Sequence, residues 1–284
     1  MRRVLLVVAL LVVAAGQGVY GAVQYEFRQT THSDLESMPA TDMTGRGILD
    51  GDRSRVDFLT GDAFPVGSYV FTLNGSRTLT YVDPTKKTYV EVNAAGVASA
   101  IGTARITISN KKVAVSQLED HPMIAGLPTD HYQMTLDYDI TLGFGSIPLT
   151  QTVHETIDKW VTQAFGNVGQ DFLSSGAVRT GNPELDELVA AENTKIKGFP
   201  LKQMMRVSTT MHRENVRGSE LSNVFRPTRT QTRELLITSI TPKSSVSSDL
   251  FLVPADFHKP DPLRDDSQKA PLQILSLQPA GGGQ

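Results

Sequence analysis

The chain contains no cysteine among its 284 residues. This absence excludes disulfide bonds, thiolate catalysis and cysteine-ligated zinc, and it also excludes lipid attachment through an N-terminal cysteine. Small secreted domains often depend on disulfides, but a chain of this length can bury a sufficient core without them. If the protein is exported, the lack of disulfides suits a bacterial envelope better than an animal extracellular space.

Basic residues are also too few to form a field that attracts nucleic acid. The 27 Lys and Arg residues stand against 30 Asp and Glu residues, which gives a formal net charge of −3. We therefore expect no nucleic-acid partner. Long apolar runs are equally scarce. The one candidate, Val4 to Ala15, is shorter than the roughly 20 residues that a membrane-spanning helix needs.

That apolar run has the features of a secretory signal peptide. Arg2 and Arg3 precede it, and small and polar residues follow it. Cleavage after Gly21 fits best, because it places Val19 and Gly21 at the two positions that prefer small side chains. A retained membrane anchor is the alternative. Cleavage would leave 25 basic and 30 acidic residues in a periplasmic or secreted protein that is not integral to a membrane.

Most of the remaining chain has the pattern of consecutive strands. From His131 to Leu142, apolar residues alternate strictly with polar ones, which is typical of an antiparallel strand with one buried face. Weaker strand patterns cover 23–30, 53–60, 68–75, 104–110, 149–162, 202–213 and 232–241. Turn residues separate many of these strands, and local connections of this kind predict a meander.

One segment has helical periodicity instead. Asn182 can cap a helix, Pro183 suits its first turn, and Gly198 can end it. The apolar face of this predicted helix would pack against the sheet, and it consists of Leu185, Leu188, Val189 and Ile196.

The chain as a whole divides into three predicted parts. We expect a signal peptide at 1–21, a single domain at 22–258 and a mobile tail at 259–284, which is rich in Pro, Gly and charge.

The stretch TLTYVDPTKKTYVEV, residues 78–92, predicts a hairpin. Asp83-Pro84 suits the opening of a type I turn, and the two lysines that follow discourage pairing at a sheet edge. We expect Tyr81 and Tyr89 to lie near each other across the strands.

Catalytic and metal motifs are incomplete. His154-Glu155 begins like the metalloprotease motif HExxH, but Asp158 occupies the position of the second His. Asp137 and Asp139 share one side of their strand and could act as paired carboxylates, but the alternation already explains them as the solvated face of an amphipathic strand. Asp50-Gly51-Asp52 opens like a calcium loop, but Gly61 replaces the required Glu. We predict no catalytic residue, metal or cofactor.

An apolar surface remains as the candidate binding site. Methionine suits variable apolar ligands because its side chain is flexible and polarizable. The residues that could line a cavity under a curved sheet are Tyr132, Met134, Leu136, Tyr138, Ile140, Met204, Met205 and Leu188. The alternative is that these side chains only fill the core beneath the helix.

Several phrases together resemble one family. These are TYVDPTKKTYVEV, IDKWVT (157–162), GFPLKQ (198–203) and LFLVPADFHK (250–259). In this order they resemble exported bacterial domains of unknown function that are related to the LolA/LolB lipoprotein carriers. The resemblance implies a mainly β (α+β) fold, a strongly curved antiparallel half-barrel with one or two helices on its concave face. In the carriers, that face holds acyl chains.

We therefore expect a non-catalytic periplasmic protein that holds a lipid, an acyl chain or an apolar peptide in its half-barrel. The first alternative is an envelope interaction or stress module that binds a protein partner through a sheet edge or the C-terminal tail. A secreted hydrolase without a recognisable motif is the further alternative.

Overall fold

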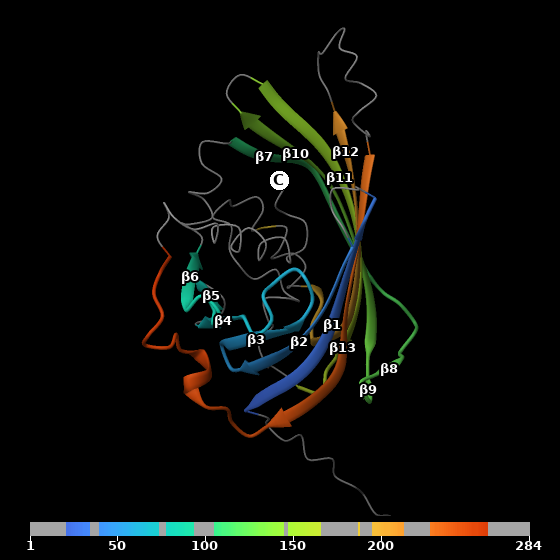
Figure 1. Cartoon of the computed structure of the whole chain (residues 1–284). Helices are drawn as coiled ribbons and strands as arrows, with labels where there is room; N and C mark the ends of the chain where they lie inside the picture. The colour runs from blue at the N-terminus through green and yellow to red at the C-terminus, as the bar shows by residue number, and fades with distance from the viewer. Residues whose placement is uncertain are drawn as a thin grey trace, which may run out of the picture.

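The computed structural model describes residues 21–34, 40–73, 78–93, 105–144, 147–165, 187, 195–212 and 228–260. Within them, eleven strands form one antiparallel sheet that is curved but not closed (Figure 1). The strands of this sheet are β1 (Ala22–Ser33), β2 (Thr41–Asp50), β3 (Arg53–Thr60), β4 (Tyr69–Leu73), β5 (Thr78–Asp83), β6 (Thr88–Asn93), β7 (Arg105–Gln117), β10 (Asp130–Phe144), β11 (Ile147–Thr162), β12 (Phe199–His212) and β13 (Thr228–Lys243). Two short strands, β8 (Met123–Ile124) and β9 (Leu127–Pro128), form a separate hairpin.

The strand order is β6-β5-β4-β3-β2-β1-β13-β12-β11-β10-β7. Chain neighbours are therefore sheet neighbours almost throughout, as the meander prediction requires. There are three exceptions. Strands β6 and β7 are consecutive in sequence but lie at opposite edges of the sheet, β1 pairs with β13, which is distant in sequence, and β7 pairs with β10 across the β8–β9 hairpin. The predicted mainly β, curved antiparallel fold is confirmed. The predicted helix at 182–198, the predicted signal peptide at 1–21 and the predicted tail at 259–284 lie mostly outside the described residues.

Alternation along the strands gives the sheet two distinct faces. On the concave face, called the inner face here, side chains from strands as distant as β5 and β12 meet in one apolar cluster. The first inner cluster includes Tyr25, Phe27 and Phe199, and the rings of Tyr25 and Phe199 are 5.6 Å apart. A second inner cluster includes Met134 and Ile157 and has its members on β7, β10, β11 and β12 and at Ile196, just before β12. Burial of these apolar side chains stabilises the sheet.

Strand β2 joins the sheet in spite of two glycines. A Cβ at Gly45 would come within 2.5 Å of the Phe27 ring, and one at Gly47 within 1.8 Å of the Tyr25 ring. The aromatic rings on β1 therefore occupy the space that side chains on β2 would take. The two glycines allow this close approach.

The 78–93 hairpin forms as predicted, but one detail of it is wrong. Asp83 Oδ1 accepts hydrogen bonds from the backbone N–H groups of Thr85 (2.9 Å) and Lys86 (3.2 Å), which fixes the turn. The register pairs Tyr81 with Val90, so Tyr81 points to the inner face and Tyr89 to the outer one. The two tyrosines consequently do not lie together.

Residues 244–260, called the C-terminal strap here, cover the outer face of strands β2 to β6. Phe251 of the strap is buried in a third apolar cluster with Ile48 and Tyr69. The strap also pairs with the edge of β6, because Tyr89 N donates to His258 O and His258 N donates to Lys87 O, each at 3.1 Å. This end of the sheet is thereby protected from pairing with another chain.

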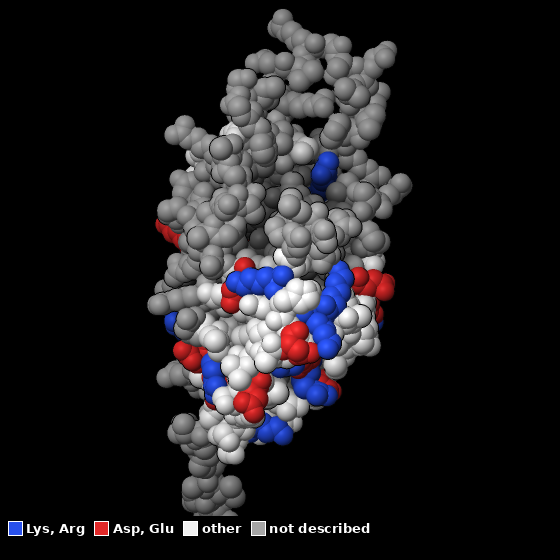
Figure 2. All heavy atoms as spheres, turned by 60° about the vertical axis from the view of Figure 1, so that its left-hand side comes forward, with Lys and Arg blue, Asp and Glu red and all other residues white. Residues whose placement is uncertain are grey.

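Opposite charges alternate on this side of the molecule. Figure 2 shows basic and acidic side chains close together on its described surface. Lys87 Nζ lies 2.8 Å from Asp256, and Lys259 Nζ lies 2.7 Å from Glu91, so two ion pairs join the strap to the β5–β6 hairpin. Both pairs are exposed and contribute little stability individually.

Candidate functional site

Three polar side chains lie in one register across the inner face, and we call them the inner polar row. Gln29 on β1 is paired with Leu235 on β13, which is paired in turn with Gln203 on β12. Gln203 is also paired with Lys159 on β11. Directly paired residues of antiparallel strands point to the same face, so the three polar side chains share the inner face. They are 2%, 2% and 3% exposed, respectively.

Apolar side chains flank this row along the strands. On β12, Gln203 lies between Leu201 of the first inner cluster and Met205 of the second. On β11, Ile157 and Val161 of the second cluster lie on either side of Lys159. The row is therefore a polar strip within an apolar surface. This arrangement suits a molecule that has both an apolar part and a polar group.

Three amide atoms of the row are left without hydrogen-bond partners within the described part of the chain. Gln203 Oε1, Gln203 Nε2 and Gln29 Oε1 are buried, and none has a hydrogen-bond partner there. Burying an amide group without a hydrogen bond costs about 1–3 kcal/mol. Native proteins rarely keep such groups without a reason, and a bound ligand is one such reason.

Charged groups lie one step further along the same face. Arg233 on β13 is paired with Met205, and Glu155 on β11 is paired with Val207; both charged side chains are buried. Burial raises the pKa of the Tyr138 phenol on neighbouring β10, and the charge of Glu155 raises it further. Tyr138 therefore stays a neutral phenol well above neutral pH.

The structure brings most of the predicted site residues to this face. Four of them, the β10 side chains that belong to the second inner cluster, are buried there: Met134, Leu136, Tyr138 and Ile140. Tyr132, which is paired with Lys159, is partly buried against the same cluster. Met205 is inner and 6% exposed, whereas adjacent Met204 is outer and 43% exposed. Leu188 lies outside the described residues.

The sequence reading did not identify the inner polar row. Gln203 shares the alternation of Leu201, Met205 and Val207, and this pattern could have marked it as a polar residue at an inner position. Gln29 offers a weaker signal of the same kind after Val23, Tyr25 and Phe27. The placement of the two amides in one row depends on the β1–β13 pairing, for which the sequence gives no local sign.

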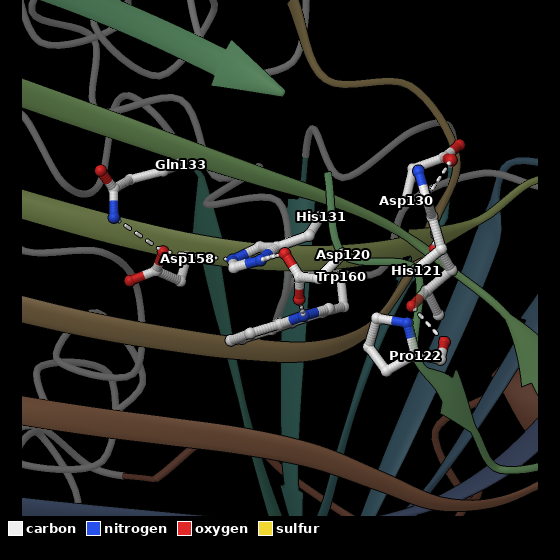
Figure 3. A network of polar contacts seen from close by, with 9 residues as sticks. Asp120, His121, Pro122, Asp130, His131, Gln133, Asp158 and Trp160 are labelled. Carbon is white, nitrogen blue, oxygen red and sulfur yellow. Dashed lines mark hydrogen bonds and ion pairs between the residues drawn. The ribbon is translucent and has the colours of Figure 1, made fainter. Parts of the chain in front are cut away.

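A separate polar network lies on the outer face (Figure 3). His131 at the start of β10 contacts Asp120 through Nδ1 at 2.6 Å and Asp158 through Nε2 at 3.2 Å. Its ring stacks on Trp160 at 4.1 Å, and Gln133 Nε2 donates to Asp158 at 3.0 Å. Because both ring nitrogens of His131 are engaged by carboxylates, neither is available as a general base.

The same network fastens the segment that carries the β8–β9 hairpin to the sheet. Asp120 precedes the hairpin in sequence, and the hydrogen bond with His131 lowers the pKa of its carboxyl group. At the base of the hairpin, Thr129 Oγ1 donates to Pro122 O at 2.7 Å, and His121 Nδ1 lies 3.3 Å from Asp130 (Figure 3). We read this network as structural.

Another outer row has the residue types of a hydrolase. Asp137 on β10, His154 on β11 and Ser208 on β12 are paired in succession, and His154 Nδ1 lies 2.6 Å from Asp137. No hydrogen bond within the described residues joins Ser208 to His154, and both His154 and Asp137 are about half exposed. A triad needs the serine held against the imidazole. Glu155, by contrast, faces the inner side, so His154 and Glu155 diverge as the strand pattern predicts.

Among the residues that the structure describes, no group of three or more His, Asp or Glu side chains is placed to hold a metal ion. In those ranges there is also no helix with the length and apolar character needed to cross a membrane.

Comparisons with known proteins find distant similarity among solved structures. No family model matches the chain, and no curated protein matches it. Among solved structures, it matches the crystal structure of a LolA superfamily protein from Nitrosomonas europaea at 12% sequence identity. The match covers 83% of this chain and 93% of that one, with a TM-score of 0.30. A similarity at this level does not establish membership of the family.

Proposed function

We propose that the protein is a non-catalytic periplasmic carrier that holds an apolar ligand on the inner face of its curved sheet. The ligand is a lipid, an acyl chain or an apolar peptide segment. In this proposal, residues 1–21 are a signal peptide that is removed on export. The apolar part of the ligand contacts the inner side chains of β10 and β12, chiefly Tyr132, Met134, Leu136, Tyr138 and Met205.

The observation that supports this proposal is the character of the inner face. Two apolar clusters lie on an open sheet, and a polar strip that contains three amide atoms without partners in the described chain runs between them. A surface that only needed to form a core would not gain from buried amides without partners. An amphiphile satisfies both parts of such a surface. The outer face, in contrast, offers a histidine with both nitrogens engaged and an incomplete triad.

Native mass spectrometry of the exported, purified protein tests the proposal. We expect a co-purifying amphiphile in a one-to-one complex, recoverable by solvent extraction, and rebinding of an acyl probe after delipidation. Absence of a co-purified ligand, together with no binding of acyl probes by the folded delipidated protein, would overturn it.

A second candidate function rests on an asymmetry between the two ends of the sheet. The edge of β6 is paired with the C-terminal strap, whereas β7 ends the sheet without a further strand neighbour among the described residues. An extended segment of an envelope protein could add a strand there. In-cell photo-crosslinking from position 114 on β7 would favour this function by trapping one specific partner, and a lack of such adducts would count against it.

A further inference from the structure

The unpartnered atoms of the inner polar row define what a ligand must offer them. Gln203 Oε1 and Gln29 Oε1 are acceptors that need donors, and Gln203 Nε2 is a donor that needs an acceptor. The complement is a group with two O–H or N–H donors and at least one acceptor oxygen. All three atoms belong to side chains that are 2% exposed, so bulk water cannot satisfy them readily.

The geometry places these atoms within reach of one small headgroup. Gln29 and Gln203 are on strands separated only by β13, and neighbouring strands lie about 4.8 Å apart. Both side chains point to the inner face at the register of Leu235. A headgroup of a few heavy atoms can therefore contact both amides, while an attached chain lies on the apolar side chains next to the row.

The cationic side chains near the row would suggest an anionic ligand. Lys159 beside Gln203 and Arg233 one step away are cationic, but Glu155 on the same face is anionic. A carboxylate or phosphate dianion supplies acceptors only. It could use Gln203 Nε2, but it would leave both glutamine oxygens without donors and would place negative charge beside them.

We infer that the inner polar row is a headgroup site selective for neutral amphiphiles with hydroxyl or amide donors, such as a monoacylglycerol. This inference rests on the proposed carrier function and adds the chemical class of the ligand. The glycerol hydroxyls of such a ligand would donate to Gln29 Oε1 and Gln203 Oε1, and its ester carbonyl would accept from Gln203 Nε2.

Three probes with the same acyl chain test the selectivity in the delipidated full-length protein. Monodecanoylglycerol offers donors and acceptors, methyl decanoate offers acceptors only, and decanoate is an anion. By calorimetry we expect the glyceride to bind about thirty-fold more tightly than either of the others, since its two added hydrogen bonds contribute about 1 kcal/mol each and 1.4 kcal/mol is ten-fold.

Matched leucine variants test whether the glyceride preference depends on the inner polar row. Gln203→Leu and Gln29→Leu should each remove most of the glyceride preference. Gln29→Leu should leave the affinity for methyl decanoate unchanged, because that ester has no donor for Gln29 Oε1, whereas Gln203→Leu also removes the Nε2 donor to the ester carbonyl and should weaken both esters. Gln133→Leu alters an outer glutamine of the same sheet and should keep the preference. Circular dichroism verifies that each variant is folded.

The outcomes separate this inference from the proposed function. Equal affinities for the three probes, tighter binding of decanoate, or a preference that survives Gln203→Leu would overturn the headgroup site and leave the carrier function standing. If no probe binds to the folded wild-type protein, the carrier function itself is overturned.

Discussion

Replacing Gln203 by leucine should stabilise the ligand-free protein. In most folded proteins, the loss of a buried polar side chain costs stability because a hydrogen bond is broken. Here both amide atoms of Gln203 lack partners within the described chain, and the side chain is 2% exposed. Leucine has a similar volume, and its neighbours Leu201, Leu235 and Met205 are apolar.

The magnitude follows from the desolvation of the amide. An unsatisfied buried amide costs about 1–3 kcal/mol in proteins, and an apolar replacement of the same shape removes that cost. We therefore expect the free energy of unfolding of the Gln203→Leu variant to rise by about 1–3 kcal/mol. For a domain of this size, each kcal/mol corresponds to an increase in Tm of about 2–4 °C.

Chemical denaturation of the delipidated protein measures the change. The matched control is Gln133→Leu, because Gln133 on the outer face donates to Asp158 at 3.0 Å and should lose about 1 kcal/mol when that bond is removed. A rise in the free energy of unfolding for Gln203→Leu and a fall for Gln133→Leu would support the reasoning. A Gln203→Leu variant that is destabilised as much as Gln133→Leu would refute it, since Gln203 would then have a partner in the free protein.

Three further changes test the fold and the outer network. Phe251→Ala should lower the free energy of unfolding by about 3–5 kcal/mol in urea, because Phe251 anchors the strap, whereas removal of residues 261–284 should leave it unchanged within error. Gly45→Ala should destabilise the sheet by about 1–3 kcal/mol through its clash with the Phe27 ring and a backbone oxygen; normal stability would contradict the account of β2. His131→Gln should raise the pKa of Asp120, measured by NMR titration, towards its ordinary value. The hydrogen bond with His131 lowers that pKa, so the contact stabilises the fold above the ordinary pKa and is lost as pH falls through the lowered one; an unchanged pKa would refute this cause.

The sequence predicted the fold better than the site because alternation is a local signal. The pattern from His131 to Leu142 correctly placed Met134 and Leu136 on the buried face of β10. The sequence did not predict strand β2 because Gly45 and Gly47 lower strand propensity. The reason for glycine at these positions is the close approach of aromatic rings on the neighbouring strand.

Other features could not be predicted from the sequence because they depend on strand register and on pairing between strands that are distant in the chain. Tyr81 and Tyr89 fall on opposite faces because the turn pairs Asp83 with Thr88, and a shift of one residue reverses every side chain. The inner polar row requires β1 to lie next to β13, more than two hundred residues away in sequence. No local pattern of hydrophobicity carries that information.

Photo-crosslinking with an acyl chain that bears a diazirine tests the central claim most directly. The delipidated protein is incubated with the probe, irradiated and digested, and adducts are assigned by mass spectrometry. The account predicts adducts on inner side chains such as Met134, Leu136 and Met205, with exposed Met204 on the opposite face unlabelled. Labelling confined to Met204 and other outer residues, or no saturable labelling at all, would contradict it.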